Sequence, residues 1–301
     1  MNKNDLNKYF KRKKIIVTGH TGFKGSWLTL SLKNLGANVL GISKNIPTKP
    51  SNYQASRINN DIQTKMIDIK NFQKLKKEIK NFEPDFIFHL AAQSLVGSSY
   101  QNPRDTWETN LIGTINILEI LKDIKKNTVV VIITSDKAYK NIEKKAGYKE
   151  TDILAGIDPY SASKSSAEIA IKSYFDCFLK NKENIKLGIA RAGNVIGGGD
   201  WSKDRLIPDC VRSWSKNKSV TIRNPHSTRP WQHVLEAVWA YILFAYKLKT
   251  VTKLNGQAFN FGPNNTKNYS VIELLNSMRK DWKNVKYSIK KSKKFKESNL
   301  L

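Results

Sequence analysis

The feature that most constrains the fold is a short glycine-rich turn near the N-terminus. Gly19, Gly22 and Gly25 follow an apolar run at residues 15–17 and lead into a helical pattern that starts at Ser26. A strand that turns through glycines into a helix leaves backbone N–H groups and the positive end of the helix dipole facing outward, which suits a pyrophosphate. The G-x-x-G-x-x-G spacing is a variant of the dinucleotide-binding fingerprint. A plain structural turn is the other interpretation of so short a motif.

Strands and helices alternate through the first two thirds of the 301-residue chain. Short apolar runs predict strands, and apolar residues at helical spacing predict the helices between them. The predicted strands are residues 15–17, 39–42, 64–67, 86–90, 129–133 and 185–190, and the predicted helices include residues 26–35, 72–79 and 105–121. This alternation predicts right-handed crossovers and an α/β fold with a doubly wound parallel sheet.

The pattern changes after residue 194, where we expect a smaller lobe to begin. A glycine-rich segment, residues 191–201, suits a mobile wall over a site. Arginines and an aromatic residue then form a cluster that could hold a nucleotide diphosphate through bidentate contacts. Its members are Arg205, Leu206, Arg223, Arg229 and Trp231. The predicted division is a Rossmann domain at residues 13–194 and a C-terminal substrate-binding lobe at 195–301, completed by a strand at 258–261 and a helix at 271–278.

The chain is strongly basic, with 52 Lys and Arg against 25 Asp and Glu and a formal charge of +27. Such a charge raises the question of a nucleic acid or an acidic membrane as partner. The lysines are scattered along helix surfaces and clustered at residues 11–14 and 290–296, without an arginine stripe, an aromatic platform or zinc-finger spacing. We therefore predict a solvated lysine-rich surface, and neither a nucleic-acid nor a membrane partner.

Other features bear on the compartment and on metals. Cys177 and Cys210 cannot form a disulfide framework, which favours a cytoplasmic protein. Residues 1–14 lack the apolar core of a signal peptide, and the apolar stretch at 234–246 is too short to span a bilayer. The histidines have no ligand spacing, so we predict no metal.

The end of the second predicted strand departs from the usual dinucleotide pattern. An acidic residue normally binds the adenosine ribose there. This chain has Ser43, Lys44 and Asn45 at that place, and no Asp or Glu between Gly25 and Asp61. Taken alone, this substitution points to a phosphorylated ribose.

Candidate catalytic residues follow the fifth predicted strand. Ser135, Asp136 and Lys137 come directly after it, where open α/β sheets place their ligands. Tyr160 and Lys164 are four residues apart, so on a helix they share one face. A lysine near a phenol lowers the tyrosine pKa, so Tyr160 could act as a base. Such a pair is often only a surface feature, and its weight here comes from the order of the motifs.

Six segments together carry a family resemblance. They are T-G-H-T-G-F-K-G at 18–25, H-L-A-A-Q at 89–93, T-S-D-K at 134–137, Y-S-A-S-K at 160–164, A-R-A-G-N-V-I-G-G-G-D-W at 190–201 and R-P-W-Q-H-V at 229–234. The chain, from about Lys13 onward, resembles the CDP-glucose 4,6-dehydratases of the extended short-chain dehydrogenase/reductase superfamily. The third and fifth segments single out this family within the superfamily.

The resemblance implies an NAD-dependent hydro-lyase acting on CDP-glucose. A hydride would leave C4 of the glucosyl unit, water would be eliminated across C5 and C6, and the hydride would return to C6. Tyr160 would remove the 4-hydroxyl proton with help from Lys164, and Ser135 would bind the sugar hydroxyl. Asp136 would protonate the departing 6-hydroxyl. Related dehydratases carry Asp-Glu here, so the C5 proton is the open role, and Lys137 could take it only in its neutral form. A recycled hydride requires an oxidised cofactor at the start, which favours NAD.

The same resemblance gives the expected contacts. The expected cofactor contacts are Gly19, Thr21, Gly22, Phe23, Gly25, Asp68, Ile69, Leu90, Ala91, Ala92, Asn110, Tyr160 and Lys164. The expected substrate contacts are Gln93, Ser135, Asn194, Arg205, Leu206, Arg223, Arg229 and Trp231. A homodimer or higher homo-oligomer is implied, through the helices near Asp105 and Tyr160. Because family members continue past the position of Leu301, we expect the chain to be truncated at its C-terminus.

Two further hypotheses stay open. One is a dehydratase or 4-epimerase for another nucleotide sugar: GDP-mannose, dTDP-glucose or a UDP-sugar. Asp136 and Lys137 argue against simple epimerisation, which needs no acid at O6. The other is a non-catalytic protein that binds a cofactor or a polyanion, as the net charge of +27 suggests.

Overall fold

A seven-stranded sheet forms the centre of the molecule, with the order β11-β6-β5-β4-β1-β2-β3. The computed structural model describes residues 3–144, 146–263 and 269–290. Every neighbouring pair in the sheet is parallel. The strands are β1 Lys14–Thr18, β2 Asn38–Ser43, β3 Gln63–Met66, β4 Phe86–His89, β5 Thr128–Ile133, β6 Ile185–Ala192 and β11 Ala258–Phe261. The predicted doubly wound sheet is confirmed, and its strand order reverses between β1 and β4.

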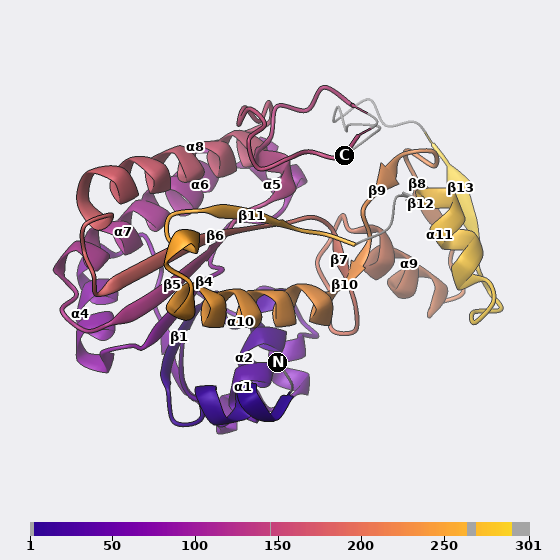
Figure 1. Ribbon diagram of the computed structural model, residues 1–301. Helices are drawn as coiled ribbons and strands as arrows, with labels where there is room; N and C mark the ends of the chain where they lie inside the picture. The colour runs from indigo at the N-terminus through magenta and orange to yellow at the C-terminus, as the bar shows by residue number, and fades with distance from the viewer. Residues whose placement is uncertain (1–2, 145, 264–268, 291–301) are drawn as a thin grey trace.

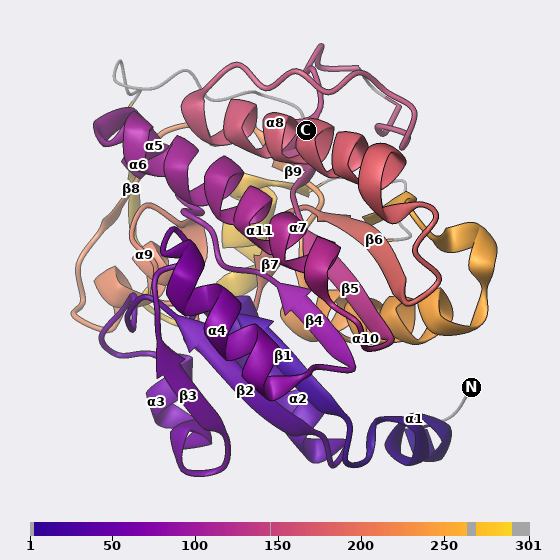
Figure 2. The same cartoon turned by 90° about the vertical axis from the view of Figure 1, so that its left-hand side faces the viewer.

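Helices cover both faces of this sheet (Figures 1 and 2). Helices α1, α2 and α10 pack on one face, and α4, α7 and α8 pack on the other. The α-helices are α1 Lys3–Phe10, α2 Phe23–Asn34, α3 Asn52–Ala55, α4 Phe72–Phe82, α5 Val96–Gln101, α6 Pro103–Trp107, α7 Gly113–Asp123, α8 Pro159–Tyr174, α9 Leu206–Trp214, α10 Val234–Thr250 and α11 Val271–Met278. Short 3₁₀ turns span Ile58–Asn60, Asp136–Ala138 and Thr252–Leu254, and π-helical turns span Glu108–Ile112 and Phe175–Leu179.

The central strands β1, β4 and β5 are mostly apolar because both of their faces are buried, whereas the edge strand β3 has the sequence Q-T-K-M and is mostly exposed. In β1, Ile15 and Val17 belong to the core under α1, α2 and α10, whereas Ile16 belongs to the core under α4, α7 and α8. In β5, Val130 and Ile132 face the second core. This alternation follows from the two-residue period of a strand. Because the strands are parallel, the C-terminal ends of β1, β4 and β5 lie at the same edge of the sheet.

Helix α1 was not predicted from the lysine-rich N-terminal sequence. Its residues Leu6 and Phe10 are buried in the core, and the Phe10 ring lies 5.1 Å from that of Phe86 in β4. The Tyr9 ring of the same helix lies 4.7 Å from the Tyr246 ring of α10. An amphipathic pattern of two apolar positions among lysines is therefore enough here to hold a helix against the core.

A smaller lobe has its own apolar cluster, to the right in Figure 1. It contains buried residues of α9, α11 and the strand β8, including Trp214, Ile222 and Leu275. Its strands pair two by two: β8 Val220–Ile222 with β13 Tyr287–Ile289, and β9 Thr228–Arg229 with β12 Tyr269–Ser270. The strands β7 Val195–Ile196 and β10 Gln232–His233 connect it to the central unit.

One expectation about the lobe was wrong. We expected the strand at residues 258–261 to belong to it, but β11 pairs with β6 as an edge strand of the central sheet. Helix α10 likewise packs on the central sheet through Val238, Tyr241 and other buried residues. The chain therefore returns from the lobe to the Rossmann unit before it builds α11. The remaining division at residues 13–194 and 195–301 stays a prediction, and residues 291–301, including most of the second lysine cluster, lie outside the described residues.

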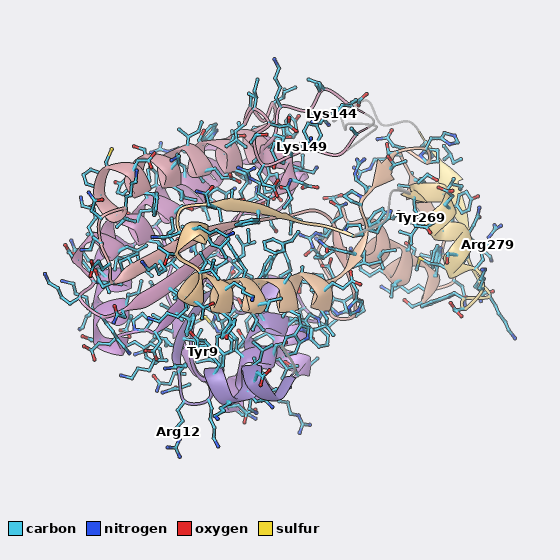
Figure 3. All side chains as sticks on the ribbon, viewed as in Figure 1. Tyr9, Arg12, Lys144, Lys149, Tyr269 and Arg279 are labelled. Carbon is cyan, nitrogen blue, oxygen red and sulfur yellow. The ribbon has the colours of Figure 1, made fainter. Side chains whose placement is uncertain are left out.

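The basic side chains are spread over the molecule. Figure 3 places Arg12, Lys144 and Arg279 at three separate edges. Many lysines are paired with carboxylates, as Lys76 is with Asp123 at 2.6 Å. Within the described ranges, no helix has the length and apolar character needed to cross a membrane. The same residues contain no group of His, Cys, Asp or Glu suited to a metal ion.

Two buried histidines make the stability of the fold depend on pH. His20 and His89 are 0% and 2% exposed, and burial lowers their pKa values to about 4 and about 3. Between pH 6.5 and 4 the unfolded chain binds protons that the folded chain does not, so stability is lost as the pH falls below 6.5. We expect the free energy of unfolding to fall by about 1 kcal/mol for each histidine between pH 6.5 and 5.5. Urea unfolding at these two pH values measures it.

Variants separate this effect from general acid sensitivity. His20→Asn is expected to flatten the pH dependence, whereas His226→Gln, which changes an exposed histidine, leaves it unchanged. A slope that is equal in all three proteins would contradict the assignment.

Candidate active site

The glycine turn joins β1 to α2 and forms a concave cradle. Side chains at its glycine positions would clash with the neighbouring backbone. Gly19 has a φ of +77°, and a Cβ there would lie 2.8 Å from the Ala91 nitrogen. A Cβ on Gly25 would lie 2.0 Å from the Gly19 oxygen. Gly22 precedes α2 and provides no side-chain cap, so the first N–H groups of the helix stay available. The cradle and its donors fit the pyrophosphate of a dinucleotide.

A network of hydroxyl groups supports the cradle. Thr21 donates through Oγ1 to the Asn45 carbonyl at 2.6 Å, and its N–H donates to Ser43 Oγ at 3.3 Å. Ser43 Oγ also lies 2.8 Å from His20 Nδ1. This network occupies the end of β2 where an acidic residue was absent from the sequence. The roles of His20 and Ser43 were missed because their contacts join positions 23 residues apart.

Other expected cofactor residues lie along the same edge of the sheet. Asp68 follows β3 and lies 3.5 Å from Lys44 Nζ, while Ile69 is buried beneath Gly113. The segment of Leu90, Ala91 and Ala92 follows β4 and is partly buried, as is Phe23 in the first turn of α2. The roles of these residues toward a cofactor stay predictions.

Asn110 and Gln93 form an internal brace. Asn110 is 1% exposed, accepts from the Gln93 N–H at 2.8 Å and donates to Ser163 Oγ at 2.9 Å. The Gln93 side chain donates to the Leu95 carbonyl at 3.0 Å and to Thr106 Oγ1 at 2.9 Å. Both amides are used within the protein. The structure therefore does not bring Gln93 into the pocket described below, and it gives Asn110 a positioning role.

Ser135, Asp136 and Lys137 form a tight turn at the end of β5. The Ser135 hydroxyl donates to Asp136 Oδ1 at 3.0 Å and accepts from the Lys137 N–H at 3.2 Å. Asp136 Oδ2 is buried and has no hydrogen-bond partner among the described residues. Burial raises the pKa of Asp136, against the opposing charges of Lys137 and Lys24. A carboxyl group that favours its protonated form can act as a proton donor.

Tyr160 and Lys164 lie in the first turns of α8. The helix starts with Asp158 as its cap, which accepts from the Ser161 N–H at 3.0 Å, and with Pro159 in the first turn. Tyr160 and Lys164 are 8% and 7% exposed. Burial lowers the pKa of Lys164 to about 8, with a further contribution from Lys24.

The expected effect of Lys164 on Tyr160 was wrong for the protein alone. Burial raises the pKa of Tyr160 above its usual value, and the opposing influences come first from the Ser135 hydroxyl and then from the charge of Arg205. The physical reason is that desolvation of a phenolate costs more than a neighbouring ammonium, itself buried, recovers.

A pocket of about 310 Å³ lies between the end of the sheet and the smaller lobe. It brings the catalytic candidates together with most of the expected substrate contacts. Its lining includes Ser135, Asp136, Lys137, Tyr160, Asn194, Arg205, Leu206, Arg223, Arg229 and Trp231. Arg205 pairs with Asp200 at 3.0 Å, and Trp231 Nε1 donates to the Tyr269 carbonyl at 3.2 Å. Arg205, Arg223 and Arg229 on its lobe side can bind a diphosphate, and Asp200, Asp204 and Asp209 line the same side.

Lys24, for which no role was predicted, also lines this pocket. Its ammonium lies 6.0 Å from the centre of the Tyr241 ring. Burial lowers the pKa of Lys24 to about 8, and the charge of Arg205 contributes while Asp136 opposes. The position of this lysine, directly after Phe23 in the glycine turn, was the sequence signal that could have indicated its place near the site.

A family model decides the assignment of the chain. The model of GDP-mannose 4,6 dehydratase matches residues 16–299. The chain belongs to the GDP-mannose 4,6 dehydratase family. A CDP-glucose 4,6-dehydratase from Salmonella typhimurium strain LT2 is 45% identical to it over 278 residues, which cover 91% of this chain and 77% of the relative.

Solved structures agree with membership of this family. A UDP-glucuronic acid 4-epimerase from Bacillus cereus, in complex with UDP-glucuronic acid and NAD, is 27% identical, with a TM-score of 0.79 over 93% of this chain and 86% of that chain. A dTDP-glucose 4,6-dehydratase from Bacillus anthracis in complex with NAD is 22% identical, with a TM-score of 0.77 over 92% of this chain and 85% of that chain. The second likeness supports the fold alone.

Proposed function

We propose that the protein converts CDP-glucose to CDP-4-dehydro-6-deoxyglucose and water as an NAD-dependent hydro-lyase. The observation that carries the proposal is one pocket that holds Tyr160 beside Asp136, in a chain 45% identical to a CDP-glucose 4,6-dehydratase. A 4-epimerase needs a group that removes the 4-hydroxyl proton but needs no acid at O6. The unpartnered Asp136 oxygen therefore favours a dehydratase over an epimerase.

The cofactor would lie across the edge of the sheet between the glycine cradle and Tyr160. Gly19, Gly22 and Gly25 would hold its pyrophosphate, and Lys164 would hold the nicotinamide ribose. When bound as NAD+, it accepts the hydride from C4 and returns it to C6. The complex of the 27% identical UDP-glucuronic acid 4-epimerase with NAD supports NAD as the cofactor.

The chain's own residues would handle the protons. Tyr160 would accept the proton of the 4-hydroxyl group, and Asp136, whose pKa is raised by burial, would give a proton to the departing 6-hydroxyl. Lys137 stands where related dehydratases carry Glu, and it lines the same pocket, so we assign it the C5 proton. Arg205, Arg223 and Arg229 would bind the diphosphate of the substrate.

A product assay tests the proposal. The purified protein with NAD+ is given CDP-glucose, GDP-mannose, dTDP-glucose or UDP-glucose, and the sugar nucleotide is followed by mass spectrometry and NMR. We expect loss of one water and a 4-keto group with CDP-glucose and little reaction with the others. A faster reaction with another nucleotide sugar would identify that nucleotide sugar as the substrate in place of CDP-glucose. No reaction with any of them, together with heparin binding that weakens steeply with salt, would favour the polyanion-binding alternative.

We further propose a homo-oligomer in the cytoplasm. Helices α7 and α8 lie side by side on one face of the molecule (Figure 2). Ile169 of α8 is 58% exposed, and Ile112, in the π-helical turn before α7, is 44% exposed. Cys177 and Cys210 are free, as a reducing compartment would keep them. Sedimentation of the purified protein tests the oligomeric state.

Gly193 offers a test of how closely Asp136 is placed. A Cβ on this residue would lie 2.8 Å from Asp136 Oδ2, the oxygen assigned to the 6-hydroxyl group. We expect Gly193→Ala to lower kcat for CDP-glucose by about tenfold, since small displacements of a reacting group cost rate. Steady-state kinetics measure the change.

The same loop supplies the control. Gly198→Ala adds a Cβ that meets nothing within 4 Å, so its kcat should match that of the parent. Equal rates in the parent and in both variants would show that the space beside Asp136 Oδ2 is not used.

A further inference from the structure

A reaction that returns its own hydride has to keep its cofactor in place between the two transfers. In the proposed reaction the hydride taken from C4 of the sugar is given back at C6, and an oxidised sugar nucleotide occupies the pocket between these steps. If the reduced cofactor left at that stage, the sugar would lack its hydride and the turnover could not be completed. A part of the protein that slows cofactor release while the substrate is bound would prevent this loss.

The glycine-rich loop lies against the helix that forms the cofactor cradle. The indole N–H of Trp27, in the second turn of α2, donates to the Gly198 carbonyl at 2.9 Å. These two residues are 171 positions apart in the chain, and Gly198 lies between β7 and α9. The bond therefore fixes a loop from the second half of the chain to the element whose first N–H groups belong to the cradle.

A second contact joins the same loop to the first turn of α2. Gly199 has a φ of +86°, and a Cβ on it would lie 2.5 Å from the Asn52 Cβ, so the loop touches Asn52 with no room for a side chain. Asn52 Nδ2 donates to Ser26 Oγ at 2.8 Å. The Ser26 hydroxyl is fully buried and donates to the Phe23 carbonyl at 3.0 Å. The loop thus rests on the first turn of α2 through one side chain.

The same loop also belongs to the substrate pocket. Gly197 and Asp200 both line this pocket. Asp200 Oδ2 accepts from Arg205 Nη1 at 3.0 Å, and the Asp200 side chain is only 6% exposed. A guanidinium group has five N–H donors, so Arg205 can bind a diphosphate through donors that Asp200 does not use. A diphosphate held by Arg205 would therefore hold Asp200 and the loop in place as well.

We propose that residues 197–200 form a strap that retains the cofactor while the nucleotide sugar is bound, with Trp27 as its anchor on α2. A diphosphate on Arg205 holds the strap closed, and loss of the anchor opens it. Because coupling between two binding sites is reciprocal, the cofactor raises the affinity for the diphosphate by the same factor. Trp27 is thus a positioning residue that acts through the loop. The inference rests on the proposed function, since a reaction that returns its hydride is the one that needs this retention.

The rate of NADH release tests the strap without any chemical step. The protein is loaded with NADH, whose fluorescence reports binding, and is mixed with excess NAD+ in a stopped-flow instrument, with and without CDP. In the parent we expect CDP to slow the release by about fivefold, the lower end of coupling between two sites. Trp27→Phe removes the indole N–H and should release NADH about fivefold faster, the range for one neutral hydrogen bond. CDP should have little effect on this variant.

Matched variants separate the strap from general packing. Trp239→Phe makes the same change on α10, where the indole packs on the core but forms no hydrogen bond with the described part of the chain, and should behave as the parent. Gly199→Ala pushes the loop away from Asn52 and should act like Trp27→Phe, even if that variant fails to fold. Gly198→Ala, whose Cβ meets nothing within 4 Å, should release NADH at the parent rate.

The strap has a second signature during turnover. With CDP-glucose, Trp27→Phe should release NADH into solution, and each NADH should be matched by one sugar nucleotide that was oxidised at C4 and received no hydride. The hydride missing from the sugar is then carried by the NADH, so oxidation and reduction balance. Absorbance of an ultrafiltrate measures the released NADH, and the parent and Trp239→Phe should release almost none.

The outcomes separate the strap from the proposed function. If the parent gives no product from CDP-glucose, the proposed function fails, and the release rates still show whether Trp27 retains the cofactor. If the parent is active but Trp27→Phe and Gly199→Ala release NADH at its rate, the loop is only a connector and the strap is wrong. An active parent whose NADH release does not respond to CDP would also overturn the strap. Equally fast release from Trp239→Phe and Trp27→Phe would mean that packing, and not the anchor, retains the cofactor.

Discussion

Replacing Tyr160 by phenylalanine is expected to lower kcat for CDP-glucose by about a thousandfold, with little change in the fold. The phenol is the group assigned to the 4-hydroxyl proton, and general acid–base groups contribute about 10² to 10⁴ in rate. Without it, neither hydride transfer from C4 nor the later elimination can begin. Stopped-flow absorbance at 340 nm, which follows reduction of the cofactor, should show no transient in the variant. Product analysis gives the overall rate.

A neighbouring tyrosine gives the matched control. Tyr241 is fully buried, and its hydroxyl has no hydrogen-bond partner in the described part of the chain. Tyr241→Phe removes an equivalent atom and should keep full activity, with equal or greater stability because no bond is lost. NAD+ should still raise the melting temperature of Tyr160→Phe, since the cradle is untouched. A Tyr160→Phe variant with more than a tenth of the parent rate would mean that another group takes the 4-hydroxyl proton.

The pH dependence of the reaction should reflect the equilibrium between the phenol and phenolate forms of Tyr160. Burial raises the pKa of this phenol in the protein alone, so a phenolate forms there only when additional positive charge or a proton acceptor is supplied. The positive nicotinamide ring of bound NAD+ would supply such charge. The sequence could indicate that a lysine lies four residues away, but the cost of burying a phenolate depends on the packing around Tyr160, which local sequence does not contain.

Much of the central fold was predictable because local sequence patterns indicate its strands and its glycine turn. The central strands β1, β4 and β5 carry apolar runs, and the glycine turn at Gly19 requires a positive φ that the structure contains. Strand β11 was wrongly assigned to the smaller lobe. Its pairing with β6 joins Ala258 to Ile189, two residues far apart in the chain. Nothing within residues 258–261 distinguishes an edge strand of the main sheet from a strand of the lobe.

The candidate site was predictable to the same extent. Ser135, Asp136 and Tyr160 could be placed together because the carboxyl ends of parallel strands meet at one edge. Lys24 could not be placed among them, since its contact with the pocket depends on which way the first turn of α2 faces. Gln93 was expected to touch the substrate, but its amide is used by Leu95 and Thr106, a pairing that sequence spacing does not reveal.

A buried ion pair that the sequence also concealed holds the catalytic elements together. Glu168 on α8 pairs with Arg191 on β6, and their side chains are 1% and 5% exposed. Glu168 also accepts from Thr134 Oγ1 at 2.6 Å, at the end of β5. Arg191 donates to the Tyr139 hydroxyl at 2.6 Å and lies over its ring. One carboxylate therefore ties the helix that carries Tyr160 to the strand ends that carry Asp136.

Removing this carboxylate is expected to destabilise the protein strongly. Glu168→Ala leaves the Arg191 charge buried without its partner, which costs about 3–5 kcal/mol. Glu168→Gln keeps the size of the side chain and the contact with Thr134, so its loss should come mainly from the charge. Urea unfolding at pH 7.5 measures both variants, and activity at low temperature tests whether α8 has shifted. We expect kcat to fall in both, because Tyr160 lies two helical turns from Glu168.

A half-exposed carboxylate shows what the same substitution does with less burial. Glu119 on α7 pairs with Lys122 at 3.2 Å, with side chains 36% and 34% exposed. It also accepts from the Tyr174 hydroxyl at 2.7 Å, a bond that the amide oxygen introduced by Glu119→Gln can keep. Glu119→Gln should leave the unfolding midpoint and kcat nearly unchanged, because water screens this pair and replaces it when it is broken. If Glu168→Gln were as stable as Glu119→Gln, the Arg191 charge would be solvated or paired elsewhere in the variant. The position of α8 relative to β5 would then depend on apolar packing, through residues such as Ile171, and not on the ion pair.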